Sequence, residues 1–325
     1  MYEKSIIFSL TANVELTDRI AQESGIVKGE SIVKHFADGE IIVHFTTTVR
    51  GKQVYIIQST CIPNVTEKLM ELLVFIDALK RASAREIVAV IPYYGYSRQD
   101  RKSRPHEPIT ARLVADMLQI AGVDRIIVFD LHAPQIQGFF KCPLDDISAV
   151  PMFSKYFRKV MSGNNDLVIV SPDHGGVTRA RKLASGFGSK EPQIAIIDKR
   201  RSKPNESEVM NIIGDVRGKT CIIIDDIIDT AKTLCNAAKS LIDAGAIAVY
   251  AAATHPILSD NAVARIEKSV IKEVVVTDTI PIPSSIKSKK LIVLSVQHLI
   301  KGAIEKIEES SSLSVIYEDY DAKDK

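Results

Sequence analysis

One stretch decides the fold of this chain: Ile222–Thr233, which reads IIIDDIIDTAKT. The isoleucine run bounded by charge predicts a fully buried strand of a parallel sheet, and a helical pattern follows it from Leu234 to Ala244. A loop between a strand and a helix presents backbone N–H groups and the positive end of the helix dipole, which suits a phosphate. Asp225 and Asp226 stand just ahead of that loop, where carboxylates can accept hydrogen bonds from sugar hydroxyls or hold a divalent cation. An acidic strand end is unremarkable by itself, but its coincidence with loop threonines and a helix start favours a site for a phosphorylated sugar.

Short β-branched runs alternate with helical patterns along the whole chain. This alternation is typical of βαβ units with a parallel sheet, so we expect an α/β fold. The clearest helical patterns are Val65–Ala82, Thr110–Ala121 and Leu234–Ala244. The predicted strands are Ser5–Leu10, Glu40–Phe45, Val54–Gln58, Ile87–Pro92, Arg125–Asp130, Leu167–Ser171, Gln193–Ile197, Thr220–Asp225, Ile247–Ala252 and Glu273–Thr277.

The two halves of the chain echo each other. Gly51-Lys52 leads into an apolar run, and Gly218-Lys219 does the same 167 residues later. A chain of 325 residues exceeds one typical core, so two domains of about 150 residues each are expected. We therefore predict two similar α/β domains, residues 1–150 and 151–325, each a mainly parallel sheet flanked by helices.

Composition narrows the possible partners. Apolar residues make up 46% and charged residues 25%, which is typical of a globular enzyme. The 42 basic and 40 acidic residues nearly cancel, which argues against nucleic acid as a partner because no basic excess exists to displace counterions. No apolar run is long enough for a membrane span or a signal peptide, so we expect a cytoplasmic protein. Reduced thiols are expected at the four cysteines, Cys61, Cys142, Cys221 and Cys235.

Reactive side chains follow three other predicted strands. These segments are Asp130-Leu131-His132, Ser171–Gly176 and Asp198–Arg201. Ligands of open parallel sheets bind beyond the carboxyl ends of the strands, so several such ends together favour one functional region. His132 fits a metal ligand, an acid–base group or an ordinary hydrogen-bonded strand end equally well.

Two basic segments remain open to more than one interpretation. Lys199–Lys203 fits either a solvated turn or a mobile lid that stabilises transferring phosphate. Arg98–Arg104 follows a tyrosine-rich stretch and suits phosphate, a purine ring or, less well, nucleic acid.

Together these segments resemble the ribose-phosphate diphosphokinases, or PRPP synthetases, of the phosphate-regulated class I. The strongest matches are Pro92–Lys102, Asp130–Phe140, Ser171–Arg181, Asp198–Arg201 and Asp225–Thr233. The resemblance covers nearly the whole chain and implies two phosphoribosyltransferase-type domains. It implies transfer of the β,γ-diphosphoryl group of ATP to the C1 hydroxyl of ribose 5-phosphate, which yields PRPP and AMP for nucleotide biosynthesis and requires Mg²⁺. A homohexamer with phosphate or ADP as allosteric effectors is implied as well.

Site roles follow from the resemblance, position by position. The catalytic positions are Lys199, Arg201 and His132, and the metal ligands are His132 and Asp173. The ATP-binding positions are Phe36, Asp38, Glu40, Arg98 and Gln99. The ribose 5-phosphate positions are Asp225, Asp226, Asp229, Thr230, Ala231, Lys232 and Thr233. The allosteric positions are Arg50, Ser83, Arg104, Ser312 and Ser314.

One departure and two competing functions accompany these roles. The family usually has glycine at the position of Lys232. The lysine side chain either points away, adds a cation or weakens sugar phosphate binding. A phosphoribosyltransferase shares the Asp225–Thr233 type of loop but needs neither basic segment, and a non-catalytic subunit is supported by Lys232 alone. Composition predicts a frayed polar tail after Ser310, whereas the allosteric role of Ser312 and Ser314 implies order there.

Overall fold

The structure, a computed structural model, describes residues 2, 4–164, 166–200 and 209–320. Its contacts divide the chain into two compact units. Unit 1 comprises residues 1–148, 279–281 and 296–313, and unit 2 comprises residues 149–278, 282–295 and 314–325. The division proposed from the sequence, 1–150 and 151–325, differs from these units at residues 149–150 and in the segments 279–281 and 296–313. Among the helices within the described ranges, none is both long and apolar enough to cross a membrane.

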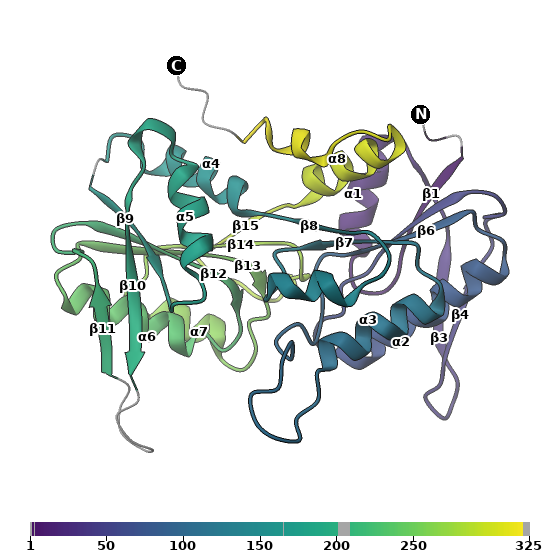
Figure 1. Cartoon of the computed structure of the whole chain (residues 1–325), viewed down its shortest axis with the longest axis horizontal. Helices are drawn as coiled ribbons and strands as arrows, with labels where there is room; N and C mark the ends of the chain where they lie inside the picture. Colours follow the sequence, from purple (N-terminus) through teal and green to yellow (C-terminus); the bar gives the residue numbers. More distant parts are fainter. Residues whose placement is uncertain (1, 3, 165, 201–208, 321–325) are drawn as a thin grey trace. The chain divides into compact units, whose positions relative to one another are not determined.

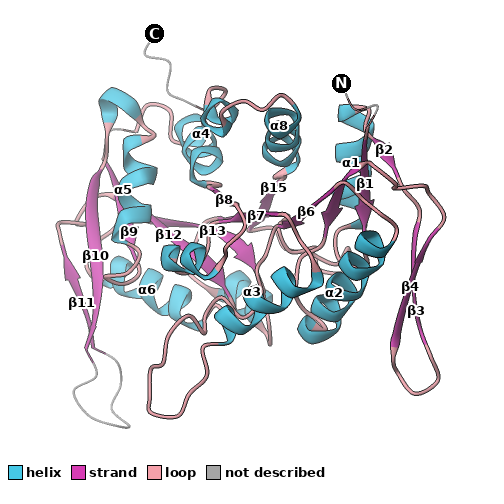
Figure 2. Ribbon diagram, turned by 45° about the vertical axis from the view of Figure 1, so that its right-hand side comes forward, coloured by secondary structure: helices cyan, strands magenta, loops and turns pink. Residues whose placement is uncertain are grey.

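Unit 1 is built on a sheet whose described strands all pair in parallel. Their order is β2 (Val27–Lys28), β1 (Ser5–Ser9), β5 (Gln53–Ile57), β6 (Glu86–Ile91), β7 (Arg125–Phe129) and β8 (Leu144–Ile147). One face carries α2 (Val65–Arg81) and α3 (Thr110–Ala121), and the other carries α1 (Val14–Ser24) and α8 (Gln297–Glu308) (Figure 1). The antiparallel hairpin of β3 (Ser31–His35) and β4 (Ile41–Phe45) forms a separate small sheet that extends beside α2 (Figure 2).

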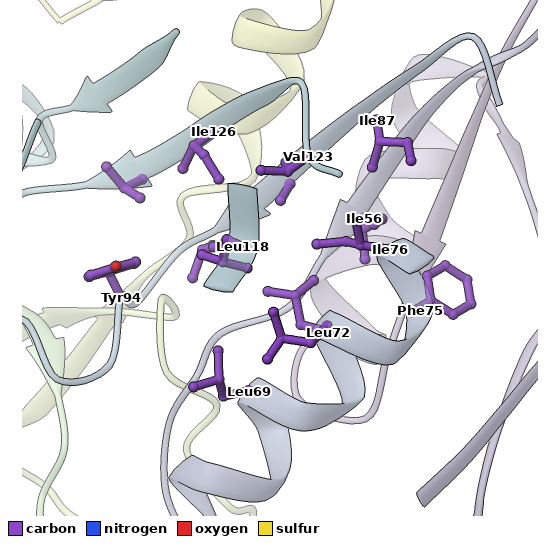
Figure 3. Close-up of a cluster of buried hydrophobic side chains, with 14 of the residues drawn as sticks. Ile56, Leu69, Leu72, Phe75, Ile76, Ile87, Tyr94, Leu118, Val123 and Ile126 are labelled. Carbon is purple, nitrogen blue, oxygen red and sulfur yellow. The ribbon is translucent and has the colours of Figure 1, made fainter. Parts of the chain in front are cut away.

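The core of unit 1 follows from helical spacing. Leu72, Phe75, Ile76 and Leu79 recur three or four residues apart on α2 and are fully buried. They belong to one cluster with the fully buried Ile56 of β5, and Figure 3 shows Leu72 and Ile76 next to Ile56. Each such side chain contributes about 1.5–3 kcal/mol when it leaves water, so this stripe holds α2 on the sheet.

Unit 2 repeats the same architecture. Its strand order is β11 (Val209–Ile213), β10 (Gln193–Arg200), β9 (Leu167–Ser171), β12 (Thr220–Ile228), β13 (Ala248–Pro256), β14 (Val274–Thr277) and β15 (Leu291–Leu294). The pairs are parallel except β10 with β11. Helices α4 (Val150–Val160) and α5 (Val177–Ser185) cover one face, and α6 (Lys232–Asp243) and α7 (Ala262–Lys268) cover the other (Figure 1). Short 3-10 helices lie at Gly188–Lys190 in unit 2, at Pro134–Phe139 in unit 1, and at Leu313–Tyr317, where the chain passes from unit 1 to unit 2.

The sequence echo corresponds to equivalent backbone turns. Gly51 N–H donates to Ser83 O and Gly218 N–H donates to Gly245 O, each at 2.8 Å. Gly51 and Gly218 both adopt positive φ, which glycine accepts without strain. The strand that follows each turn pairs in the same register with its neighbour, so β5 and β12 occupy equivalent places in the two sheets.

The observed elements confirm the α/β prediction and correct several boundaries. Each predicted strand and helix corresponds to an observed one, but β12 runs on to Ile228 instead of ending at Asp225, so Asp226 also lies inside the strand. The prediction of a frayed tail is wrong as far as Tyr320. Arg158 donates a 2.8 Å hydrogen bond to Tyr320 O, and the Lys155 ammonium lies 5.2 Å from the Tyr320 ring centroid. Residues 321–325 lie outside the described ranges.

Candidate functional site

Two carboxylates and one arginine meet near the carboxyl end of β12 in unit 2. Asp225 is one-third exposed, whereas the side chain of Asp226 is only 5% exposed. Arg179, in the first turn of α5, lies 3.3 Å from Asp226 Oδ1 and 3.4 Å from Asp225 Oδ1. Because the guanidinium group is planar and carries several N–H donors, one arginine can contact both carboxylates and hold them side by side.

This crowding changes the ionisation of Asp225. Burial, and then the neighbouring charge of Asp226, raise the pKa of Asp225 from 3.8 to about 8, although Arg179 opposes the rise. The backbone N–H of Asp226 also donates to Asp225 Oδ1 at 2.9 Å. A carboxyl group in this state can donate as well as accept hydrogen bonds, which suits vicinal sugar hydroxyls.

The loop after β12 accepts hydrogen bonds from the segment that follows β13 and from α7. Ser259 donates a hydrogen bond to Asp229 Oδ1, and Arg265 Nη1 donates to Thr230 O. Ala231 has φ +59°, a left-handed conformation that turns the chain into the first residue of α6, Lys232. Thr233 and Lys232 are exposed at this helix N-terminus, where an anion is favoured.

The remaining predicted residues of unit 2 lie after β9 and near the end of β10. Asp173 is exposed in the turn after β9, and its Oδ1 accepts the Gly176 N–H at 3.0 Å. His174 Nε2 lies 3.3 Å from Asp198 Oδ1 at the end of β10. Lys199 lies within β10, which runs on to Arg200 instead of ending at Ile197 as predicted. Arg201 lies outside the described residues.

In unit 1, the predicted nucleotide residues lie on the segment between β6 and α3. Arg98 and Gln99 are exposed, and the Gln99 side chain accepts a 2.6 Å hydrogen bond from Thr110 at the start of α3. His132 is exposed just after β7. The preceding Asp130 has φ +36° and accepts a 2.9 Å hydrogen bond from Ser148.

The hairpin β3–β4 presents the other predicted ATP-binding residues at its tip. Phe36 is 53% exposed, and its N–H donates to Glu40 O at 2.9 Å. Asp38 Oδ1 accepts the Glu40 N–H at 3.1 Å, which closes the turn. An exposed aromatic ring on a rigid turn is a suitable stacking surface for a planar base.

The predicted allosteric residues are all exposed. Arg50 precedes the turn in which Gly51 N–H reaches Ser83 O at 2.8 Å, so these two positions are neighbours in unit 1. Arg104 N–H donates to Glu107 Oε2 at 2.9 Å in the loop before α3. Ser312 is in unit 1 and Ser314 is in unit 2.

Two cavities lie at the amino ends of the strands, the ends opposite those that carry Asp225, Asp173 and Arg98. A cavity of about 970 Å³ in unit 1 reaches Gln53, Glu86 and Arg125, which begin β5, β6 and β7. A cavity of about 560 Å³ in unit 2 reaches Leu167 and Gln193, which begin β9 and β10. Since ligands of parallel sheets bind at the carboxyl ends of strands, the candidate site is the open carboxyl edge and not these cavities.

Three contacting residues were not singled out from the sequence. Arg179, Ser259 and Arg265 reach the acidic strand end and its loop from other elements. Arg179 carried a usable signal, because it stands one helical turn after the Gly175-Gly176 pair. Ser259 and Arg265 carried none, since nothing in a local pattern indicates contact with a loop about thirty residues earlier.

Comparison with known proteins places the chain in a family. Residues 5–122 match the N-terminal domain of ribose phosphate pyrophosphokinase, and residues 189–318 match the phosphoribosyl synthetase-associated domain. Ribose-phosphate pyrophosphokinase 1 of Streptococcus pneumoniae is 54% identical over 314 residues, covering 96% of each chain. The Listeria monocytogenes protein of the same name is 56% identical over 312 residues, again covering 96% of each chain.

A solved structure agrees with this assignment. The phosphoribosylpyrophosphate synthetase of Mycobacterium smegmatis is 42% identical, with a TM-score of 0.89 over 95% of this chain and 100% of that one. These matches each cover 95% or more of the chain. The chain therefore belongs to the ribose-phosphate pyrophosphokinase, or PRPP synthetase, family.

Proposed function

We propose that this enzyme transfers the β,γ-diphosphoryl group of ATP to the C1 hydroxyl of ribose 5-phosphate, producing PRPP and AMP. The observation that carries the proposal is the acidic end of β12 followed by a loop and a helix N-terminus, in a chain more than half identical to proteins named ribose-phosphate pyrophosphokinase. The C1 oxygen bonds to the β-phosphorus, the bond from that phosphorus to the α,β-bridging oxygen breaks, and AMP leaves. The hydroxyl proton passes to solvent.

Unit 2 supplies the sugar site in this proposal. Asp225 and Asp226 bind the ribose hydroxyls, and Arg179 keeps the two carboxyl groups adjacent. The segment Asp229–Thr233 surrounds the 5-phosphate, including Thr230, Ala231 and Lys232, with the positive end of α6 favouring the dianion. Fixing the sugar at both ends orients its C1 hydroxyl, which is the main requirement for an in-line transfer.

Unit 1 supplies residues for ATP. Arg98 and Gln99 contact the nucleotide, and the hairpin tip with Phe36, Asp38 and Glu40 binds adenine. The exposed Phe36 ring and the hydrogen-bonded turn beneath it support this assignment. Lys199 and Arg201 are proposed to neutralise charge on the transferring phosphates, by family resemblance alone.

The donor set suits Mg²⁺ bound largely through substrate phosphates. Among the described residues, no group of three or more His, Cys, Asp or Glu side chains gathers as a metal cage. Asp173 is exposed, its Oδ1 accepts the Gly176 N–H, and its Oδ2 is an oxygen ligand of the type that Mg²⁺ prefers. His132 is the second proposed ligand. When bound, Mg²⁺ would offset phosphate charge, and the protein side chains would orient the substrates.

Assembly and regulation are proposed from the family resemblance. We propose a homohexamer with phosphate and ADP as effectors, acting near Arg50, Ser83, Arg104, Ser312 and Ser314. The adjacency of Arg50 and Ser83 across one backbone turn supports a shared anion site. The four free thiols, two of them buried, suit a reducing cytoplasm.

An assay that separates AMP from ADP tests the proposal. Purified protein is incubated with ATP, Mg²⁺ and ribose 5-phosphate, and we expect AMP and PRPP in equal amounts only when the sugar phosphate is present. Formation of ADP, or of AMP without sugar phosphate, contradicts a diphosphoryl transfer. Absence of any turnover favours a non-catalytic subunit. Lys199→Ala should lower turnover strongly with substrate binding kept, and an unchanged rate would remove this residue from the mechanism.

A further inference from the structure

The duplicated architecture gives unit 1 an equivalent of the sugar-binding strand end. β5 pairs with β6 from Gln53 and Glu86 onward, as β12 pairs with β13 from Thr220 and Ala248 onward. Counting along the strands from these pairs, Gln58 and Ser59 of unit 1 occupy the places of Asp225 and Asp226. Instead of two carboxyl groups, this end of β5 carries an amide and a hydroxyl, both fully buried.

Buried hydroxyl groups at this strand end are hydrogen-bonded to the turn after β6. Ser59 Oγ accepts the Tyr93 N–H at 3.1 Å and donates to Thr279 O at 2.6 Å. Thr60 Oγ1 accepts the Gly95 N–H at 2.6 Å and donates to Tyr93 O at 3.3 Å. A second bond joins Thr60 N–H to Tyr93 O at 3.0 Å. Both hydroxyl groups therefore act as donor and acceptor at once, a role that an apolar side chain cannot take.

The backbone approaches too closely for this contact to be incidental. A Cβ atom at Gly95 would lie 2.4 Å from Thr60 O and 2.8 Å from Thr60 Oγ1, so a larger residue would separate the two segments. The next residue, Tyr96, has φ +63°, and its phenol shares a 2.8 Å hydrogen bond with Thr66 of α2. Unpaired hydroxyl and amide groups at such buried positions are unfavourable, which keeps the turn in one conformation.

The turn leads directly to the exposed residues that face solvent at the carboxyl edge. Gln99 N–H donates to Tyr96 O at 2.9 Å, and Ala111 N–H donates to Gln99 O at 3.2 Å. The hydrogen bonds Thr60–Gly95 and Tyr96–Gln99, joined by the peptide bond between Gly95 and Tyr96, thus connect the segment after β5 with Gln99 and its neighbour Arg98. A displacement of the turn would carry these two side chains with it.

We propose that Ser59 and Thr60 are positioning residues for nucleotide binding by Arg98 and Gln99. Ser59 occupies the place that Asp226 has in unit 2, and Thr60 the place of the next residue, Ile227. The inference rests on the proposed function, because it takes Arg98 and Gln99 as ATP-binding residues. One strand end of the duplicated unit binds substrate, and its equivalent orients the residues that bind the other substrate.

The test compares Thr60→Val with Thr60→Ser in steady-state kinetics of the full-length protein. Thr60→Val keeps the shape of the side chain and removes both hydrogen bonds of the Thr60 hydroxyl group. We expect the KM for ATP to rise about tenfold, because a small displacement of a positioned group weakens its contact with the substrate. The KM for ribose 5-phosphate should stay within about twofold, and Thr60→Ser should restore most of the affinity for ATP. Thr220→Val is the matched control, since this buried threonine lies at the amino end of β12 and accepts a hydrogen bond from Asn164.

The outcomes separate this inference from the proposed function. An unchanged KM for ATP in Thr60→Val, together with a raised value in Arg98→Ala, would overturn the positioning role alone. An unchanged KM for ATP in Arg98→Ala would overturn the nucleotide assignment, and the positioning role with it. If Thr60 has only a structural role, Thr60→Val should lower the melting temperature and leave the ratio of the KM for ATP to the KM for ribose 5-phosphate as in the wild type. That outcome would also overturn the positioning role. If Thr60→Val does not fold, Ser59→Ala is scored by the same ratio, with Ser59→Thr as its conservative partner.

Discussion

Single residues at the end of β12 combine opposing electrostatic demands. Asp225 and Asp226 are adjacent in sequence, and within the strand their side chains both reach Arg179. Burial disfavours the charged form of Asp225, repulsion from Asp226 adds to this, and the positive charge of Arg179 opposes both. The balance leaves Asp225 with a pKa near 8, so this group titrates around neutral pH.

Asp225 should make stability depend on pH. Its folded pKa of about 8 exceeds the ordinary 3.8, so between these values the folded state keeps a proton that the unfolded chain loses. The free energy of unfolding should therefore fall as pH rises from about 4 to 8, then level off. Urea unfolding of Asp225→Asn, which cannot ionise, should show a shallower decline across this window. Asp243→Asn, an exposed change in α6, should leave the decline intact, and parallel curves for all three proteins would contradict the assignment.

Lys232 should favour binding of the 5-phosphate and should slightly lower the stability of the protein. A cation at a helix N-terminus is unfavourable by about 0.3–1 kcal/mol, so Lys232→Ala should stabilise the protein slightly. The same change should raise the KM for ribose 5-phosphate roughly three- to tenfold, because a cation near a dianion is lost. Kinetics with each substrate varied in turn would measure this, with Lys239→Ala in the same helix as control. A lower KM would instead mean that Lys232 hinders the sugar phosphate.

Among the elements, the short helix α7 stabilises the loop that follows β12. It contributes Arg265, whose guanidinium contacts Thr230 O and also lies 3.2 Å from Asp260. The hydrogen bond from Arg265, then the backbone N–H of Asn261, lower the pKa of Asp260, and Lys232 adds to this effect. The helix therefore connects the phosphate loop to a charged turn on its outer side.

Removing this connection should loosen the loop without unfolding unit 2. Arg265→Ala is expected to lower the unfolding free energy by roughly 1 kcal/mol, because a partly exposed charged hydrogen bond is lost. The KM for ribose 5-phosphate should rise several-fold, while the KM for ATP should not change. Lys268→Ala, an exposed change on the same helix, is the control, and equal effects from both variants would exclude a specific contact.

For the whole molecule, the chain returns to unit 1 after building unit 2. Helix α8 buries Leu299, Ile300, Ala303 and Ile304 in unit 1, and Glu308 accepts hydrogen bonds from Ser5 and Tyr55 at 2.7 and 2.8 Å. Burial and the Glu308 contact raise the pKa of Tyr55 well above its usual range, which keeps the phenol protonated as a donor. The first unit is thus completed by residues that lie about 250 to 300 positions further along the chain.

Ile304→Ala should therefore destabilise unit 1 although it lies near the end of the sequence. The side chain is fully buried, so a loss of about 2–4 kcal/mol is expected from the cavity it leaves. Hydrogen exchange should show the loss in β1 and β5. The matched control is Ile120→Ala on α3, where the side chain is 81% exposed and little change should occur. Loss of protection confined to residues near α8 would contradict a structural role for this helix in the unit 1 core.

The sequence by itself determined the α/β alternation, the strand behind Asp225 and Asp226, the helix start near Lys232 and the family to which the chain belongs. These are local properties, since periodicity and turn chemistry act over a few residues. Only the tertiary structure decided that Arg179 bridges the two carboxylates, that α8 completes unit 1 and that the buried hydroxyl of Thr60 bonds to Gly95. Such contacts join segments tens to hundreds of residues apart, and their partners are selected by packing and hydrogen-bond satisfaction in the folded chain, which no local pattern encodes.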